Sequence, residues 1–111
     1  MLKERKDANM SQFQKRNEFR KNKKSGHPAY IFAKIGDKFV YIGLTHDDVL
    51  KSGIKCIELD KNPNPDDQEK SYAKPYTETL KENKFSKQPY KNWSFSENDR
   101  KKIEKIKKRT K

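Results

Sequence analysis

The stretch Ala29-Tyr-Ile-Phe-Ala-Lys-Ile-Gly-Asp-Lys-Phe-Val-Tyr-Ile-Gly-Leu44 decides the fold that this sequence predicts. It contains two runs of β-branched and aromatic residues, 29–35 and 38–44, separated only by Gly36 and Asp37. Glycine followed by aspartate is typical of a type II′ hairpin loop, because glycine readily adopts the positive φ of the first loop position. The sequence therefore predicts an antiparallel β-hairpin.

A two-residue loop also determines which residues of the hairpin face one another. Counting outward, the predicted partners are Ile35 and Lys38, Ala33 and Val40, Ile31 and Ile42, Ala29 and Leu44, and finally His27 and His46. Side chains alternate between the two faces of a strand, so the same count also sorts the residues by face. One predicted face is aliphatic, and the other holds the aromatic residues Tyr30, Phe32, Phe39 and Tyr41.

His27 and His46 are the chain's only histidines, and the predicted register makes them cross-strand neighbours with Cβ atoms about 5 Å apart. Because imidazole titrates near neutral pH, one ring can act as general acid and the other as general base on an RNA phosphodiester. The pair is therefore the candidate catalytic site of a metal-independent ribonuclease. Two alternatives stay open: the rings only end the strands, or they hold a transition metal with Asp47 or Asp48 as a third ligand.

The residues after the hairpin predict short elements and turns. Residues 47–53 are typical of a short helical turn with an aspartate cap and a glycine stop, and residues 54–59 of a third strand. Two Asn-Pro pairs in residues 61–67 indicate consecutive turns. Residues 58–69, here called the acidic segment, do not have the spacing of an EF-hand calcium loop. We expect this segment to clamp the sheet edge or to contact a basic arm.

Residues 83–95 interleave three lysines with four aromatic residues. Lysines for phosphates beside aromatic rings for bases are the composition of a strip that binds single-stranded nucleic acid. The alternative is that Trp93 and Phe95 anchor this segment to the core.

A C-terminal helix is predicted from Ser96, an N-cap residue followed three positions later by Asp99. Its apolar stripe consists of Ile103 and Ile106, through which we expect the helix to dock. The N-terminal arm, with Met10 and Phe13 at helical spacing, predicts a weaker helix.

The net charge of +12 is unevenly distributed along the 111 residues. Residues 1–24 carry nine Lys or Arg against three acids, residues 100–111 carry eight against one, and residues 25–99 have a net charge of −1. By contrast, twelve of the twenty Leu, Ile, Val and Phe residues lie in residues 29–59. We therefore expect a folded body, 25–99, between a basic N-terminal helix or arm, 1–24, and the basic end of a C-terminal helix, 100–111.

The composition also excludes several classes of protein. A chain of 13.2 kDa has room for one small domain. The single cysteine, Cys56, excludes an internal disulfide framework and a multi-cysteine zinc site, and its neighbours favour a core position. No apolar run approaches the roughly 18 residues of a membrane-spanning helix, and no signal-peptide pattern is present. We expect a cytoplasmic α+β protein with an antiparallel sheet of three to four strands, no cofactor and no membrane partner.

Three motifs, followed by a tryptophan and a lysine-rich helix, carry a family resemblance: His27-Pro-Ala-Tyr-Ile31, Tyr41-Ile-Gly-Leu-Thr-His46 and Lys61-Asn-Pro-Asn-Pro65. Over residues 26–110 the sequence resembles small uncharacterised basic proteins from phages and mobile elements of low-GC Gram-positive bacteria. This resemblance implies no particular activity. Size, basicity and the expected helix-plus-sheet layout also resemble microbial ribonuclease toxins, which is a likeness of fold only.

Two like-charged arms repel each other unless an anionic partner lies between them, and nucleic acid is the commonest such partner. The predicted function is binding of RNA or single-stranded nucleic acid. A more specific form of this prediction adds RNA cleavage by His27 and His46. The predicted nucleic-acid-binding residues are Arg16, Arg20, Tyr30, Phe32, Phe39, Tyr41, Lys84, Lys87, Tyr90, Lys91, Trp93, Arg100, Lys101, Lys105, Lys108 and Arg109. The alternative is a non-enzymatic phage or mobile-element inhibitor that binds a host nucleic-acid-handling protein, which the acidic segment favours because carboxylates repel phosphate.

Overall fold

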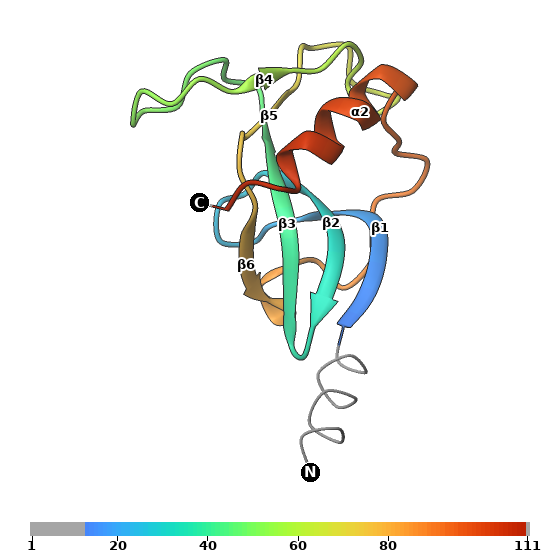
Figure 1. The fold of residues 1–111 in the computed structure, drawn as a ribbon. Helices are drawn as coiled ribbons and strands as arrows, with labels where there is room; N and C mark the ends of the chain where they lie inside the picture. The colour runs from blue at the N-terminus through green and yellow to red at the C-terminus, as the bar shows by residue number, and fades with distance from the viewer. Residues whose placement is uncertain (1–12, 111) are drawn as a thin grey trace.

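The computed structural model describes residues 13–110 as an antiparallel sheet with one C-terminal α-helix (Figure 1). The elements are the strands β1 (Phe13–Lys21), β2 (Pro28–Ile35), β3 (Lys38–Thr45), β4 (Ile57–Glu58), β5 (Tyr72–Ala73) and β6 (Glu78–Lys81), the 3-10 helix η1 (Glu82–Lys84) and the helix α2 (Glu97–Ile106). The strand order is β1-β2-β3-β5-β4, and β6 also pairs with β3. The α+β class is confirmed, with six strands in place of three or four.

The β2–β3 hairpin forms at the predicted loop, where Gly36 has a φ of 61°. Its first pairs, Ile35 with Lys38 and Ala33 with Val40, follow the predicted register. An irregularity between Ile31 and Ala33 then shifts the register by one residue. The observed pairs beyond this bulge are Ile31 with Tyr41, Tyr30 with Ile42 and Ala29 with Gly43, so the predicted pairs Ile31–Ile42 and Ala29–Leu44 are wrong.

The shift also changes which side chains share a face, because a slip of one residue exchanges the faces of a strand. The cluster on one face, here called the inner cluster, consists of Ala29, Ile31, Phe39, Tyr41 and Phe85. The helix-side cluster on the other face consists of Phe19, Tyr30, Ile42, Leu44, Leu59, Ala73, Phe95, Ile103 and Ile106. Each face therefore mixes aliphatic and aromatic residues, and the predicted separation into an aliphatic and an aromatic face is wrong.

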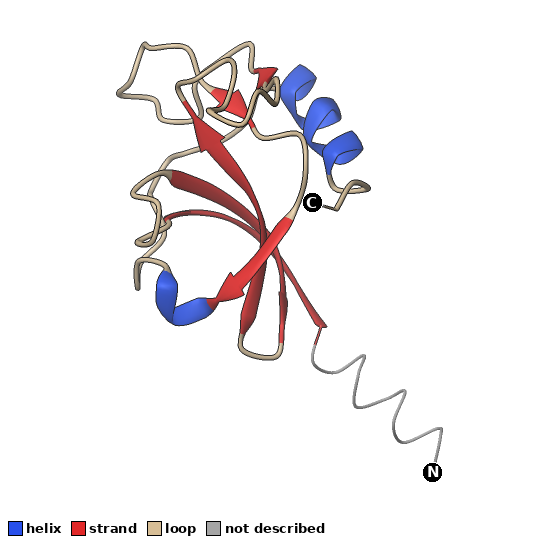
Figure 2. Ribbon diagram, turned by 90° about the vertical axis from the view of Figure 1, so that its left-hand side faces the viewer, coloured by secondary structure: helices blue, strands red, loops and turns tan. Residues whose placement is uncertain are grey.

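The segment after β6 returns along the free edge of β1. Backbone N–H groups of Lys23, Ser86 and Tyr90 donate to the carbonyl oxygens of Lys84, Lys21 and Phe19 at 2.8, 2.9 and 2.7 Å. This return joins the C-terminal end of β1 to the segment that follows β6, around the inner cluster, and covers the edge of β1 at Phe19 and Lys21. Figure 2 shows η1, at the start of the return, and α2 on different sides of the strands.

The helix predicted in the N-terminal arm is wrong for residues 13–21, which form β1. Pairing with β2 and burial of Phe19, which is 4% exposed, outweigh a weak local helical pattern. Met10 and the rest of residues 1–12 lie outside the described residues.

The helical turn predicted for residues 47–53 is also wrong. The N–H of Leu50 donates to the carbonyl of Ile54, and Val49 bridges Lys55, so this segment forms a tight turn between two short extended pieces. The third strand predicted for residues 54–59 reduces to β4, and both Leu59 and Ile57 pack on the helix-side cluster.

The C-terminal helix begins as predicted, since the Ser96 side chain accepts a hydrogen bond from the N–H of Asp99 at 3.1 Å. Ile103 and Ile106 are 2% and 0% exposed, so the predicted docking stripe is confirmed. The helix ends at Ile106, and the predicted helical continuation to the end of the basic segment is therefore wrong. The carbonyl of Arg109 instead accepts hydrogen bonds from the N–H and the Oγ1 of Thr77, at 2.9 and 3.0 Å.

Candidate functional site

The paired segments 21–24 and 84–91 gather lysines that are far apart in the sequence. We call this set the lysine patch; it consists of Lys21, Lys23, Lys24, Lys84, Lys87 and Lys91. All six side chains are exposed, and none forms an ion pair with any described residue. Like charges held together on a surface attract anions, so this patch is the first candidate interface.

Next to the lysine patch, Tyr90 and Trp93 form a stacked aromatic pair. Their ring centroids are 4.3 Å apart and the ring planes differ by only 9°. Between them, Asn92 has a φ of 65°, a left-handed conformation that asparagine tolerates better than most residues. Trp93 is half-buried against Phe19, whereas Tyr90 is 36% exposed. The pair therefore offers an aromatic surface anchored to the core.

Both histidines line a single cleft of about 310 Å³, together with Lys21, Tyr90, Trp93 and Asp67. The predicted reason for their proximity is wrong, because the β2–β3 pairing ends at Ala29 and Gly43, in a register shifted from the predicted one, and does not reach His27 and His46. The two rings nevertheless share this cleft, beside the stacked aromatic pair. The cleft has a basic side near Lys21 and an acidic side near Asp67.

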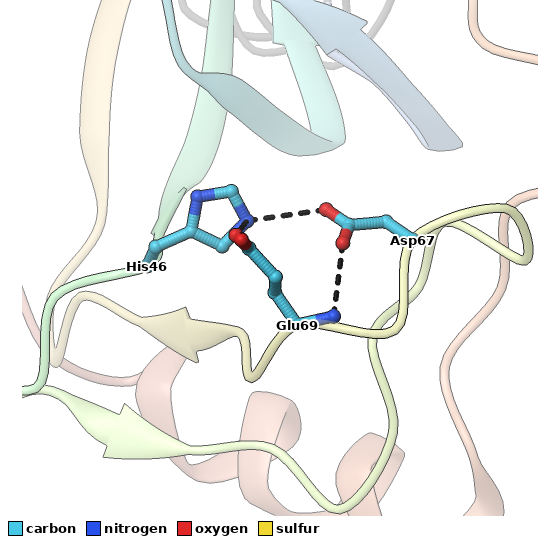
Figure 3. A group of neighbouring side chains, drawn as sticks. All are labelled: His46, Asp67 and Glu69. Carbon is cyan, nitrogen blue, oxygen red and sulfur yellow. Dashed lines mark hydrogen bonds and ion pairs between the residues drawn. The ribbon is translucent and has the colours of Figure 1, made fainter.

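On the acidic side, His46 lies between two carboxylates. Its Nε2 is 3.2 Å from Asp67 Oδ2 and 3.5 Å from Glu69 Oε2 (Figure 3). The backbone N–H of Glu69 and, to a lesser extent, His46 hold the pKa of Asp67 below its usual range. Asp47 and Asp48, which the sequence suggested as metal ligands beside the histidines, do not belong to this cluster. The contact of His46 with Asp67 and Glu69 is not predicted by the sequence, since both acids lie more than twenty residues from His46.

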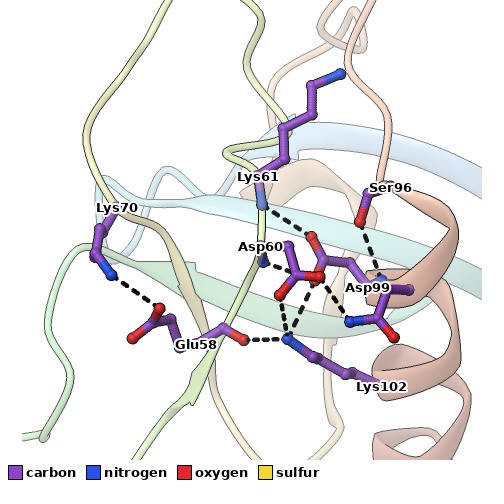
Figure 4. A network of polar contacts seen from close by, with 8 residues as sticks. Glu58, Asp60, Lys61, Lys70, Ser96, Asp99 and Lys102 are labelled. Carbon is purple, nitrogen blue, oxygen red and sulfur yellow. Dashed lines mark hydrogen bonds and ion pairs between the residues drawn. The ribbon is translucent and has the colours of Figure 1, made fainter.

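The acidic segment makes its other contacts within the molecule. Lys102 Nζ lies 2.9 Å from Asp60 Oδ1 and 3.4 Å from Asp99 Oδ1, and it donates to the carbonyl of Glu58 at 2.8 Å (Figure 4). Hydrogen bonds from Asn98 and Lys102 lower the pKa of Asp60. The expected contact between the acidic segment and a basic arm is therefore confirmed at α2.

Several predicted binding residues are not accessible to a ligand. Tyr30, Phe39 and Tyr41 are 6%, 0% and 6% exposed, so their rings are not open for base stacking as predicted. Phe32 is half-buried, with Lys107 Nζ 5.3 Å from its ring centroid. The shifted hairpin register explains this difference, because it places these rings in the two clusters.

Arg20 is a further correction, since it is 8% exposed and serves the fold. Its guanidinium donates to the carbonyls of Ser86 and Lys87, each at 2.9 Å, and lies 5.2 Å from the Phe39 ring centroid. Its Nε contacts Glu18, which also pairs with Arg16. The arginine therefore fastens the returning segment to β1 and is not free to contact phosphate.

The basic residues of the C-terminal segment remain at the surface. Arg100, Lys101, Lys105, Lys108 and Arg109 are exposed and form no ion pair with described residues. They lie on or after α2, whereas the lysine patch lies along β1 and the returning segment. Cys56 is half-buried, and burial raises the pKa of its thiol, which disfavours the reactive thiolate.

No family model, no curated protein and no solved structure matches this chain. Within residues 13–110, no helix has both the length and the apolar character that crossing a membrane requires.

Proposed function

We propose that the protein binds RNA or single-stranded nucleic acid through the lysine patch, with Tyr90 and Trp93 as the surface on which a base stacks. The observation that supports this proposal is that backbone hydrogen bonds between residues 19–23 and 84–90 bring two lysine-bearing segments together, with Lys21 lining one cleft with the stacked Tyr90 and Trp93. Lysines gain affinity by displacing counterions from phosphates, and an aromatic ring contributes about 1–3 kcal/mol per stacked base.

Single strands fit this surface better than a duplex. A duplex keeps its bases stacked on one another, whereas a single strand can present an unstacked base to Tyr90. The α-helix of residues 13–110 is α2. Its apolar stripe is buried, and the ion pair between Lys102 and Asp60 holds it against the acidic segment. The exposed face of α2 carries Arg100, Lys101 and Lys105, which can contact phosphates but lack the amide side chains that read adenine.

The experiment is fluorescence anisotropy of a labelled single-stranded RNA with the full chain at several salt concentrations. The Lys87→Ala/Lys91→Ala variant should lose about tenfold in affinity at low salt. The slope of log affinity against log salt concentration should fall by the amount that about two phosphate contacts contribute. The matched control is Lys51→Ala/Lys55→Ala, which removes the same charge from exposed lysines elsewhere. Equal losses in both variants would show that only net charge matters, and binding that is absent or insensitive to salt would exclude the proposal.

Cleavage of the bound RNA is the second candidate, favoured by the cleft that His27 and His46 share. One ring would take the proton of a 2′-hydroxyl, and the other would protonate the leaving 5′-oxygen. This mechanism predicts RNA degradation that persists in EDTA and is lost in both His27→Ala and His46→Ala. Degradation that survives both substitutions would assign the histidines no catalytic role.

The remaining alternative is an inhibitor, of phage or mobile-element type, that occupies the phosphate channel of a nucleic-acid-handling protein. A channel that binds phosphates is lined with cations, so the acidic segment has the complementary charge and the lysine patch does not. A pull-down from nuclease-treated lysate distinguishes the two, because only the inhibitor would retain one specific protein when nucleic acid has been removed.

A further inference from the structure

His46, Asp67 and Glu69 bring three possible metal-ligand atoms close together. One imidazole nitrogen and one oxygen from each carboxylate all lie within 4.8 Å of one another (Figure 3). No lysine or arginine of residues 13–110 forms an ion pair with either carboxylate. Glu58 and Asp60, in the same acidic segment, are by contrast paired with Lys70 and Lys102. Two negative charges therefore converge on one imidazole without a lysine or arginine to balance them.

The spacing of the donor atoms matches that of ligands around one metal ion. With bonds of about 2.0–2.2 Å, the ligand atoms of a tetrahedral site lie about 3.3–3.6 Å apart. The distances from His46 Nε2 to the two carboxylate oxygens are 3.2 and 3.5 Å. The two carboxylate oxygens lie within 4.8 Å of each other, so they would have to approach by at most about 1.5 Å for an ion to bind all three atoms.

The loop holds these donors in place before any ion arrives. Asp67 Oδ1 accepts a hydrogen bond from the Glu69 N–H at 2.9 Å, which leaves Oδ2 directed at His46. Asn62 Nδ2 donates to the Glu69 carbonyl at 3.0 Å, and Asn62 Oδ1 accepts from the N–H of Asn64 at 2.9 Å. Outer contacts of this kind orient metal ligands and raise affinity.

We propose that His46, Asp67 and Glu69 bind one divalent transition-metal ion, with Zn²⁺ or Mn²⁺ as the class that suits one imidazole and two carboxylates. Mg²⁺ and Ca²⁺ bind more weakly, because they prefer oxygen ligands alone. Three protein ligands on an exposed loop leave coordination positions open to water or to an anionic oxygen. The ion would also convert the acidic side of the cleft into a surface that no longer repels phosphate, a consequence that rests on the proposed function.

Metal binding and acid–base cleavage make opposite demands on His46. An ion held by Nε2 occupies the lone pair that would otherwise carry a proton, so a metal-loaded site cannot use His46 as a general acid or base. Added Zn²⁺ should therefore inhibit any cleavage that depends on this ring. The metal proposal itself stands without nucleic acid, because the ion alone is the probe.

The experiment is competition between the full chain and a chromogenic chelator for Zn²⁺, together with Mn²⁺ titration followed by electron paramagnetic resonance. The wild-type chain should bind one equivalent. His46→Gln, Asp67→Asn and Glu69→Gln should each weaken binding by at least about tenfold. Asp67→Asn is the most informative variant, since asparagine keeps the Oδ1 that accepts from Glu69 and removes only the charged ligand oxygen.

The matched controls are His27→Gln, which alters the other histidine of the same cleft, and Asp66→Asn, which alters the neighbouring exposed acid. Both should bind Zn²⁺ as the wild type does, and circular dichroism should show that every variant is folded. If the controls lose as much affinity as the triad variants, or if the wild type binds no ion, the proposal is wrong. Loss of RNA binding in the lysine variants would not affect this result, so the two proposals fail separately.

Discussion

At the scale of single residues, Tyr41 has a measurable consequence for stability. Its ring is in the inner cluster, and its hydroxyl accepts from Asn22 Nδ2 at 3.5 Å. Burial, together with the nearby Glu78, raises the pKa of Tyr41 to about 12, against 10.0 for a free phenol. Because the folded state disfavours the phenolate, this contribution to stability is complete below pH 10 and is lost as the pH rises toward 12.

We therefore expect the urea midpoint of the wild type to fall more steeply between pH 10 and pH 12 than that of Tyr41→Phe, which has no proton to lose. Urea unfolding at a series of pH values measures this difference. Tyr72→Phe, on the half-buried face of β5, is the control for removing a hydroxyl elsewhere. Identical pH profiles for Tyr41→Phe and the wild type would show that Tyr41 does not titrate with unfolding.

Tyr90 allows a test of base stacking at the same scale. Trp93 is the only tryptophan in the chain and stacks on Tyr90, so its fluorescence reports on the surroundings of that ring pair. A short uridine oligonucleotide should quench this fluorescence. Tyr90→Leu should weaken the binding measured in this way by about fivefold or more, whereas Tyr90→Phe keeps a ring and most of the affinity. Equal affinity for the leucine and phenylalanine variants would mean that no base stacks there.

At the scale of elements, the docking of α2 depends on Asp99, which is fully buried. Its two carboxylate oxygens accept from the N–H groups of Asp60 and Lys61 at 2.8 and 3.1 Å, and its own N–H donates to Ser96. The Ser96 side chain thus caps the helix start, and the Asp99 side chain fastens it to the acidic segment (Figure 4). Ile103 and Ile106 bury the apolar side of the same contact, at about 1.5–3 kcal/mol for each side chain.

Asp99→Ala should lower the free energy of unfolding by about 2–3 kcal/mol, because two part-buried N–H groups lose a charged acceptor that is itself fully buried. Urea unfolding measures this loss. Asp66→Ala, at an exposed position in the same segment, should change stability by no more than about 0.5 kcal/mol. A loss at Asp99 no larger than at Asp66 would show that α2 docks through its isoleucines alone.

At the scale of the whole molecule, the positive charge is divided between two surfaces. The lysine patch lies along β1 and the returning segment, and a second group of basic residues lies on α2 and just after it. Asp60 of the acidic segment pairs with Lys102. Among the described residues, no acid forms an ion pair with the lysine patch or with the second group, which consists of Arg100, Lys101, Lys105, Lys108 and Arg109. Trp93 lines one pocket with Arg100 of α2, whereas Tyr90, the more exposed ring of the aromatic pair, shares its cleft with Lys21. We therefore expect the surface beside Tyr90, which is the lysine patch, to be the one that meets an anion.

We expect Lys101→Ala/Lys105→Ala, on α2, to weaken RNA binding by less than about threefold, compared with the tenfold expected for the lysine patch. Both double variants remove the same charge, so anisotropy measured at one salt concentration isolates position from net charge. A larger loss for the α2 variant would move the interface to the helix, where the sequence also predicted it.

Short-range patterns in the sequence correctly predicted several structural features of this protein. The Gly36-Asp37 loop, the Ser96 cap and the Ile103–Ile106 stripe each depend on residues within a few positions of one another, and all three are confirmed. Predictions that depended on register over longer distances were wrong, since one bulge near Phe32 moved Tyr30, Phe39 and Tyr41 into the two clusters.

The sequence by itself determined the fold class, the hairpin, the docking of the last helix and the excess of positive charge. Only the tertiary structure decided which charges stand together, because hydrogen bonds from β1 to the returning segment join residues more than sixty positions apart. The same holds for His46, Asp67 and Glu69, whose proximity depends on a loop folding back toward the end of β3. Local preferences act over a few residues, whereas a site is assembled by contacts between segments that no short pattern encodes.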